Sequence, residues 1–177
     1  MSLRLRPFQS GDAAAVVSWL QNERSFYQWS ADRYGHYPIT AEEMERYYAP
    51  QLASGRVYPM TAFDESGPVG HVLLRFPDEE LAVLRFGFIV VDSAKRGRGY
   101  GREMLELALL YAFRLLKASK VTLGVFENNP AAYRCYRSLG FSEVKENPFV
   151  CFSILGEEWR CLELELSRER WEGQESF

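Results

Sequence analysis

The first third of the chain alternates between strand-like and helix-like patterns of hydrophobic positions. Residues 3–7 alternate apolar and charged side chains, which predicts a short strand. Asp12 precedes an apolar run, which predicts a helix with Asp12 as its N-cap. A T-x-x-E capping box opens a second predicted helix over residues 40–52. Between them, residues 22–38 are dense in aromatic and polar side chains, and we predict a long loop with a functional role.

The middle of the chain predicts three strands in succession, over residues 57–63, 69–76 and 81–91. The third is long and rich in β-branched side chains, as is typical of strands. The joints between them are short and contain turn-forming residues. Such short joints favour an antiparallel meander.

Two helices follow, with one strand between them. Residues 101–118 place apolar side chains on a broad side and charges opposite, which predicts an amphipathic helix. Residues 120–126 predict a strand. A short helix with well-marked ends comes next: Asn129 is the expected N-cap, Pro130 the first helical residue and Gly140 the left-handed stop.

The C-terminal part predicts more strands, over residues 141–146, 149–156 and 158–167, with a hairpin around residues 156–158. Strands and helices alternate in the centre and strands flank them, so we expect a mixed α/β sheet. A chain of 177 residues with 47% hydrophobic and 25% charged residues is typical of one soluble domain. We therefore expect a single domain over residues 1–177.

Charge and cysteine content narrow the class of protein. The 21 cations and 24 anions give a net charge of −3, which argues against a dedicated nucleic-acid binder. Cys135, Cys151 and Cys161 show no C-x-x-C spacing, which favours reduced thiols without a zinc site. The sequence has no signal peptide and no apolar run of about 18 residues, so we expect a cytoplasmic protein away from membranes.

The segment "KRGRGYGR", residues 95–102, raises a specific chemical question. Counting excludes a dinucleotide fingerprint and a P-loop, because Arg102 stands where either would need glycine. The segment nonetheless joins a strand to a helix N-terminus, where free N–H groups attract anions. Its glycines let the backbone approach a phosphate, and its arginines suit phosphate oxygens. A phosphate-binding turn is predicted, and a solvated basic turn is the alternative.

Two motifs carry a resemblance to a known family. "RGRGYG" matches the Arg/Gln-x-x-Gly-x-Gly/Ala acetyl-coenzyme A signature, and "NPAAYRCYRSLGF" matches the later Asn-x-x-Ala-x-x-x-Tyr-x-x-x-Gly-Phe element. The chain thereby resembles the GNAT N-acetyltransferase superfamily. The pattern over 81–142 resembles its ribosomal-protein N-terminal acetyltransferase-like branch. Ser93 and Cys135 depart mildly from the usual proline and leucine.

The resemblance implies an α/β fold: a mixed, mostly antiparallel twisted sheet of about seven strands, with helices on both faces. A splayed V is implied between residues 85–91 and 120–126. The implied activity moves an acetyl group from acetyl-coenzyme A to a primary amine, by direct attack in a ternary complex. The resemblance implies a small-molecule or peptide amine as acceptor and leaves open a protein N-terminus, a polyamine, an amino acid or an antibiotic amine. Homodimers are common in the family. A non-catalytic acyl-coenzyme A sensor or scaffold of this fold is the alternative.

The resemblance also assigns residues to the cofactor. The pantetheine arm would pair with the end of the third strand of the meander, and the pyrophosphate would lie on the glycine-rich amides. The implied cofactor-binding residues are Ile89, Val90, Val91, Arg96, Gly97, Arg98, Gly99, Tyr100, Gly101, Arg102, Asn129 and Tyr136. Tyr136 is the implied acid, because a phenol near the sulfur can protonate the departing thiolate.

The base and the acceptor wall are less constrained. Glu127, just past a strand end, is the first candidate for the base. Glu79, Glu80, His71 or a chain of water molecules are the alternatives, and His71 in an apolar strand also suits a core role. The aromatic rings of Tyr27, Trp29 and Tyr34 are expected to line the acceptor site or else to cover the core.

Overall fold

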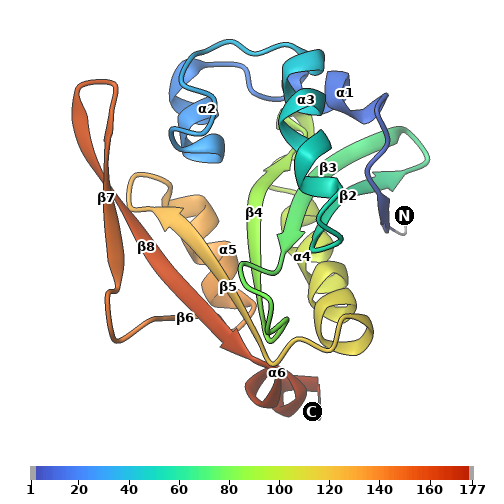
Figure 1. Cartoon of the computed structure of the whole chain (residues 1–177), viewed down its shortest axis with the longest axis vertical. Coiled ribbons are helices and arrows are strands. Elements are labelled where there is room, and N and C mark those ends of the chain that lie inside the picture. Colours follow the sequence, from blue (N-terminus) through green and yellow to red (C-terminus); the bar gives the residue numbers. More distant parts are fainter. Residues whose placement is uncertain (1–2, 176–177) are drawn as a thin grey trace.

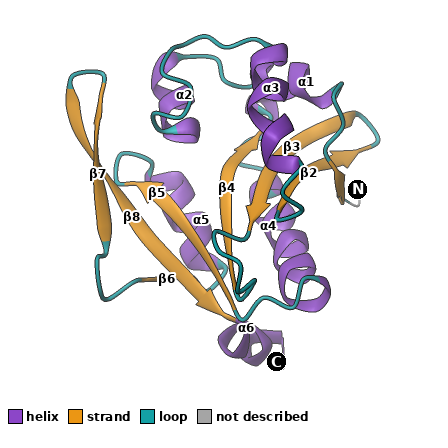
Figure 2. Cartoon of the chain, viewed as in Figure 1, coloured by secondary structure: helices purple, strands orange, loops and turns teal. Residues whose placement is uncertain are grey.

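A computed structural model describes residues 3–175 of the chain. The described part contains eight strands and six α-helices, coloured along the chain in Figure 1 and by type in Figure 2. The strands are β1 (Arg4–Pro7), β2 (Val57–Asp64), β3 (Gly67–Arg75), β4 (Val83–Val91), β5 (Lys120–Phe126), β6 (Ser142–Glu143), β7 (Phe149–Ile154) and β8 (Glu157–Ser167). The helices are α1 (Asp12–Ser18), α2 (Glu23–Ser30), α3 (Ala41–Leu52), α4 (Tyr100–Leu110), α5 (Pro130–Ser138) and α6 (Arg168–Glu175). A 3₁₀ turn, η1 (Ser93–Lys95), precedes α4, and a π-helical turn, η2 (Tyr111–Leu115), continues it.

All strands form one sheet in the order β1-β2-β3-β4-β5-β8-β6, with β7 also pairing with β8. Strands β1 to β4 are antiparallel neighbours, as the meander predicted. Only β4 and β5 run parallel within the described sheet, because α4 crosses between them. The predicted mixed, mostly antiparallel sheet is confirmed.

Successive residues of β3 point to opposite faces of the sheet, so both faces are buried. Leu74 packs with Met104 of α4 in one core, while Leu73 packs with Phe26 and Met44 of the N-terminal helices in another. Burying a large apolar side chain contributes about 1.5–3 kcal/mol, so each layer of helices is held by several such residues. Helices therefore cover both faces, as predicted.

Sequence patterns placed most elements, and the exceptions have local reasons. The capping box of α3 is present, and α5 begins after Asn129 as predicted. Asp12, however, is not an N-cap: Gly11 holds that place. The Asp12 carboxylate is buried instead, and accepts hydrogen bonds from Arg6 at 2.7 Å and Thr61 at 2.7 Å.

The prediction of a loop over residues 22–38 was wrong in its first half. Residues Glu23–Ser30 form α2, whose N-cap Asn22 accepts a hydrogen bond from the Ser25 N–H at 2.8 Å. An Asn before a short amphipathic run was the available signal. The aromatic residues obscured it, because they suit loops and pockets as well as helices.

Several predictions in the middle and C-terminal parts of the chain were correct in type but wrong in extent. The strand expected over 141–146 is only Ser142–Glu143, and the strand expected over 81–91 begins at Val83. The predicted helix over 101–118 is α-helical only to Leu110 and then passes into η2. Helix α6 was missed, because a single large apolar residue, Trp171, cannot establish a helical period. The Trp171 ring packs on the Phe113 ring, with 5.1 Å between their centroids.

Candidate active site

The sheet opens into a V where β4 and β5 part. Their pairing runs from Val83↔Lys120 to Phe86↔Leu123 and then stops. A bulge begins just beyond, with Phe88 at φ 48°, and two residues of β4 there oppose one of β3. Bulges bend a strand and re-aim its side chains. The predicted splayed V is therefore confirmed. Beyond Phe86, no strand within residues 3–175 pairs with the β5-facing edge of β4.

A cavity of about 640 Å³ fills this V. It brings together most of the predicted cofactor-binding residues: Ile89, Val90, Val91, Arg96, Gly97, Gly99, Gly101, Arg102, Asn129 and Tyr136 all line it. Arg98 and Tyr100 do not. Three elements distant in the sequence, β4, the glycine turn and α5, therefore face one space.

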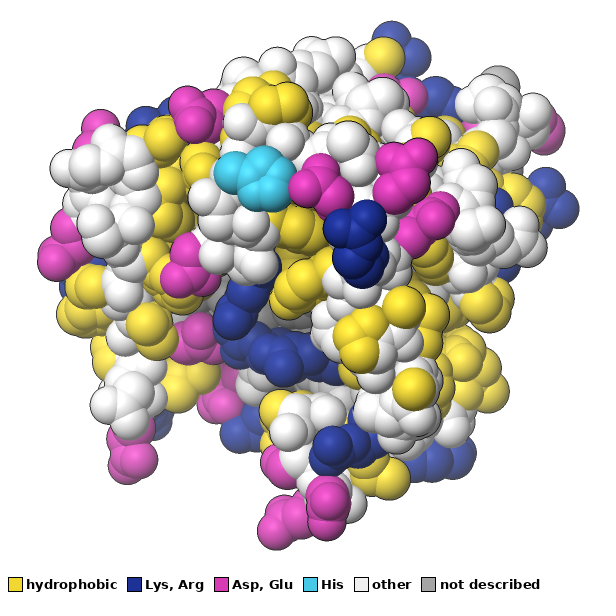
Figure 3. Space-filling model, turned by 45° about the horizontal axis from the view of Figure 1, so that its top comes forward, with side chains coloured by type: hydrophobic (Ala, Val, Ile, Leu, Met, Phe, Trp, Pro, Cys, Tyr) yellow, Lys and Arg dark blue, Asp and Glu magenta, His cyan; other side chains and the backbone are white. Residues whose placement is uncertain are grey.

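A smaller cavity of about 180 Å³ adjoins the first on the side of α3 and β7. The two share lining residues: Gln28, Trp29, Gly87, Phe88, Gly124 and Phe126. The smaller cavity adds three cations that the sequence analysis did not single out: Arg33, Arg75 and Arg85. Figure 3 shows Lys and Arg side chains gathered in a hollow on one face of the molecule.

The glycine turn has the conformation that only glycine adopts readily. Gly97 has φ 73° and Gly99 has φ 86°, both in the left-handed region. A Cβ at either position would meet nothing within 4 Å, so backbone conformation rather than crowding requires glycine. Gly99 is the N-cap of α4 and offers no side-chain cap. The N–H groups of the first helical turn are thus free for an anion.

The cations of the turn differ in their partners. The Arg102 guanidinium donates to Glu106 at 2.9 Å and to the Ser138 hydroxyl at 3.0 Å. Arg96 lines the larger cavity, and its guanidinium has no hydrogen bond or ion pair within residues 3–175. Arg96 is therefore the cation of the turn that is both unpaired and directed to the cavity.

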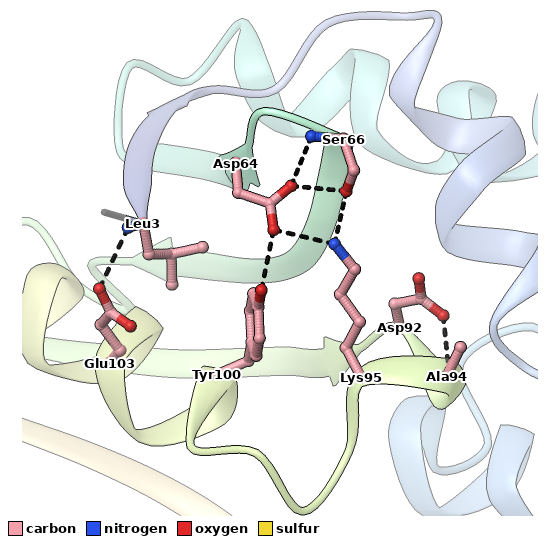
Figure 4. A network of polar contacts seen from close by, with 8 residues as sticks. All are labelled: Leu3, Asp64, Ser66, Asp92, Ala94, Lys95, Tyr100 and Glu103. Carbon is pink, nitrogen blue, oxygen red and sulfur yellow. Dashed lines mark hydrogen bonds and ion pairs between the residues drawn. The ribbon is translucent and has the colours of Figure 1, made fainter. Parts of the chain in front are cut away.

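Lys95 instead anchors the turn to the β2–β3 hairpin. Its ammonium lies 2.8 Å from an Asp64 carboxylate oxygen, which also accepts from the Tyr100 hydroxyl at 2.9 Å (Figure 4). The Lys95 hydrogen bond, assisted by Ser66, holds the pKa of the Asp64 carboxyl well below its usual range. The Tyr100 side chain thus supports the turn from behind and does not line the cavity.

Tyr136 comes from α5 and lines the larger cavity with only 6% of its surface exposed. Burial raises the pKa of its phenol above the ordinary value of 10.0. The hydroxyl consequently stays protonated at neutral pH. Tyr133, one turn away, donates to Glu143 at 2.6 Å instead. Of these two phenols, only Tyr136 reaches the V.

Helix α2 contacts the turn between β5 and α5 through a hydrogen-bonded side chain that no local sequence pattern predicts. The Gln28 side-chain amide donates to the Asn128 carbonyl and to its side-chain oxygen, each at 3.0 Å. Next to it, Asn129 caps α5 by accepting from the Ala132 N–H at 3.3 Å and also lines the cavity. Gln28 was missed because its partner lies 100 residues away in the sequence.

The structure separates the predicted bases from both cavities. Glu127 lies outside their lining and forms an ion pair with Arg160 at 3.3 Å. Glu79 and Glu80 are exposed on the β3–β4 loop. His71 is fully buried beside the Tyr48 hydroxyl at 2.8 Å, and burial lowers its pKa to about 3. Among the described lining residues there is no Asp, Glu or His.

The three aromatic residues predicted to line the acceptor site differ in whether they line a cavity. Trp29 lines both cavities, and its ring lies 4.9 Å from the Phe88 ring. Tyr34 stacks on Trp29 at 5.9 Å without lining either cavity, and burial raises the pKa of its phenol. Tyr27 packs on Phe26 at 5.3 Å, also outside the lining. Trp29 is thus the member of this group that faces the V.

None of the helices within residues 3–175 is long and apolar enough to cross a membrane. Over the same residues, no group of three or more His, Cys, Asp or Glu side chains is arranged to hold a metal ion.

Comparison with known proteins places this geometry in context. The family model described as an acetyltransferase (GNAT) domain matches residues 2–142. Spermine/spermidine N(1)-acetyltransferase of Bacillus subtilis is 30% identical over 96 residues, 54% of this chain and 55% of that protein. Spermidine N(1)-acetyltransferase of Vibrio cholerae is 25% identical over 142 residues, 80% of this chain and 79% of that protein. The match therefore spans about half the length of the Bacillus relative.

A solved structure has the same fold. The crystal structure of spermidine N-acetyltransferase from Vibrio cholerae, in complex with CoA and spermine, superposes with a TM-score of 0.80. It covers 96% of this chain and 98% of that chain at 21% identity. The likeness extends over the whole architecture, including the parts outside the family match.

Proposed function

Because the chain belongs to the GNAT acetyltransferase family, we propose that it transfers an acetyl group from acetyl-coenzyme A to a primary amine. The observation that carries this proposal is the V itself. An unpaired strand edge, a left-handed glycine turn with free N–H groups, and a buried protonated tyrosine all face one cavity. These features suit, in turn, an amide-bearing arm, a pyrophosphate and a leaving thiolate.

The residues present fit acetyl-coenzyme A, which supplies an activated acetyl thioester when bound. The β4 edge at Ile89 to Val91 would hold the pantetheine amides, and Arg96 would pair with phosphate. In the reaction, the amine nitrogen bonds to the acetyl carbon as the carbon–sulfur bond breaks. Tyr136 gives its hydroxyl proton to the sulfur. Solvent takes the proton that the nitrogen loses and returns one to the Tyr136 phenolate. A water-mediated route suits a cavity lined by no carboxylate or imidazole among the described residues.

Two acceptor classes have separate support. Two of the relatives are named as spermine/spermidine and spermidine N(1)-acetyltransferases, which favours a polyamine. The resemblance of residues 81–142 to the ribosomal-protein N-terminal acetyltransferase-like branch keeps a peptide N-terminus as the second candidate. Both are primary amines, so the chemistry proposed for Tyr136 is the same for either.

The test measures thiol release from acetyl-coenzyme A against spermidine, amino acids and short peptides. Tyr136→Phe is expected to lower kcat by about 100-fold, the lower end for a general acid. Tyr133→Phe is the matched control on the same helix and should leave kcat unchanged. Acetyl-coenzyme A binding without release for any amine would favour the sensor, and equal rates for the two variants would overturn the role of Tyr136.

We also propose that the chain self-associates. A spermidine N-acetyltransferase of Vibrio cholerae is known in a dodecameric structure, and homodimers are common in the family that the sequence resembles. Strand β7 and its hairpin expose Phe149, Val150 and Leu155 at 38%, 49% and 45%. Sedimentation velocity tests this, since a monomer at micromolar concentration would contradict it.

A further inference from the structure

Three guanidinium groups converge on the smaller cavity from three parts of the chain. Arg75 and Arg85 are direct partners across β3 and β4, so their side chains emerge on the same face of the sheet. Arg33 reaches the cavity from the loop after α2. Gly124 makes room beside them, because a Cβ there would lie 3.0 Å from an Arg85 nitrogen. The arrangement brings like charges together inside a recess.

The protein balances one of these three charges. Glu163 accepts hydrogen bonds from both terminal nitrogens of Arg85, at 2.7 Å and 2.9 Å. The guanidinium groups of Arg33 and Arg75 have no hydrogen bond or ion pair anywhere in residues 3–175. Arg75 is also half-buried, and burial followed by the charges of Arg85 and Arg33 lowers its pKa. A partly desolvated cation without a counter-ion is unfavourable unless a ligand supplies one.

The lining is the opposite of what a polycation needs. None of the described residues that line either cavity is Asp or Glu. A polyamine entering the smaller cavity would meet two unpaired guanidinium groups, and like charges at close range repel. A carboxylate or a phosphate would pair with them in the forked geometry that guanidinium favours.

We propose that the smaller cavity binds an anionic group of the acceptor, a carboxylate or a phosphate, through Arg33 and Arg75. This rests on the proposed acetyl transfer, because the two cavities share Gln28, Trp29 and Phe88 and so place the acceptor's anion beside the V. Trp29, Phe88 and Phe126 add an apolar wall for the body of the acceptor. The acceptor class is therefore an amine that also carries an anionic group.

The test compares matched amines with and without the anion: phenylalanine with phenylalaninamide, and phosphoethanolamine with ethanolamine, with spermine as a polycation. Initial rates give kcat/KM for each amine with acetyl-coenzyme A. At least one anionic amine should exceed its neutral partner by about tenfold, as expected for one charge-assisted pair. The pair that shows the preference identifies carboxylate or phosphate as the group bound.

The variants are Arg33→Gln and Arg75→Gln, which leave no unpaired carboxylate behind. Each variant should reduce the preference to about threefold, since one of the two arginines that bind the anion is lost. Arg46→Gln is the control, because Arg46 is exposed on α3 and lines neither cavity. Arg33→Glu should raise kcat/KM for spermine, and thermal melts check that all variants fold.

Calorimetry of the same amines with the CoA-loaded protein separates this inference from the proposed activity. Anion-selective binding that disappears in Arg75→Gln would support the anion site. If such binding occurred but no amine were acetylated, the anion site would stand and the proposed acetyl transfer would be overturned. Equal binding of charged and neutral partners, or highest turnover on spermine by the unmodified protein, would overturn the anion site while leaving acetyl transfer intact.

Discussion

The part of the larger cavity that suits the cofactor is built mainly from backbone groups, whereas the smaller cavity is built mainly from side chains. Strand β4 and the glycine turn present main-chain groups whose positions follow from a bulge and two left-handed residues. The smaller cavity depends on Trp29 of α2, Arg33 of the α2–α3 loop and Arg75 of β3. A site made of backbone groups can be predicted from neighbouring residues, because those residues determine the conformation of a turn. Side-chain sites require the packing of distant elements.

The face of the sheet covered by α1, α2 and α3, here called the acceptor side, should lose stability in acid before the face covered by α4. The reason is that His71 is buried on the acceptor side, beside Tyr48 of α3. Between pH 3 and 6.5 the unfolded chain binds a proton that the folded His71 does not, so stability falls as the pH falls through this window. The loss can reach about 1.4 kcal/mol per pH unit. Tyr48 contacts the ring and Asp12 lies near enough to oppose part of the shift.

Urea unfolding at pH 7 and pH 5 measures this loss, and hydrogen exchange locates it. Amides of α3 should lose protection before those of α4. His71→Gln should remove most of the pH dependence, while His36→Gln, at an exposed position, should retain it. Equal protection of both helices at pH 5 would show that the two sides are not distinct in this respect.

A second prediction addresses the backbone side through conformation alone. Gly97→Ala and Gly156→Ala place the same side chain at φ 73° and φ 75°, and neither Cβ would meet another atom within 4 Å. Each should destabilise the fold by about 1–2 kcal/mol, the cost of a left-handed residue with a Cβ. Only Gly97→Ala, in the glycine turn, should also weaken acetyl-coenzyme A binding, by about tenfold.

Calorimetry with acetyl-coenzyme A measures both variants against the unmodified protein. If Gly156→Ala in the β7–β8 hairpin weakened binding as much, the effect would come from general destabilisation and not from the turn.

The smallest effect is expected for single cations of the turn. Arg96→Ala should weaken acetyl-coenzyme A binding about fivefold, because an exposed arginine contributes less than a buried one. Arg98→Ala is the matched control, since Arg98 is also exposed and unpaired among the described residues but does not line the cavity. The measurement is binding at two salt concentrations, where only the Arg96 difference should shrink as salt rises. Equal losses of acetyl-coenzyme A affinity in the two variants would contradict the proposal that Arg96, and not Arg98, contacts the cofactor.

Hydrophobic periods and capping residues in the sequence were enough to predict most of the sheet, α3, α5 and the order of the elements. Local signals of the same kind predicted the glycine turn and the N-cap Asn129, and the family motif that spans α5 singled out Tyr136. Local sequence also carried the family, and with it the expected V. These features depend on residues that are neighbours in the chain.

Only the tertiary structure showed which of the predicted residues face the V. Arg98, Tyr100 and Glu127 look equivalent to their neighbours in sequence, yet the fold directs them away from both cavities. Gln28 meets Asn128 across 100 residues, and Arg75 meets Arg85 through strand register. The acceptor side is therefore absent from any local pattern, because packing and register bring its residues together from separate elements.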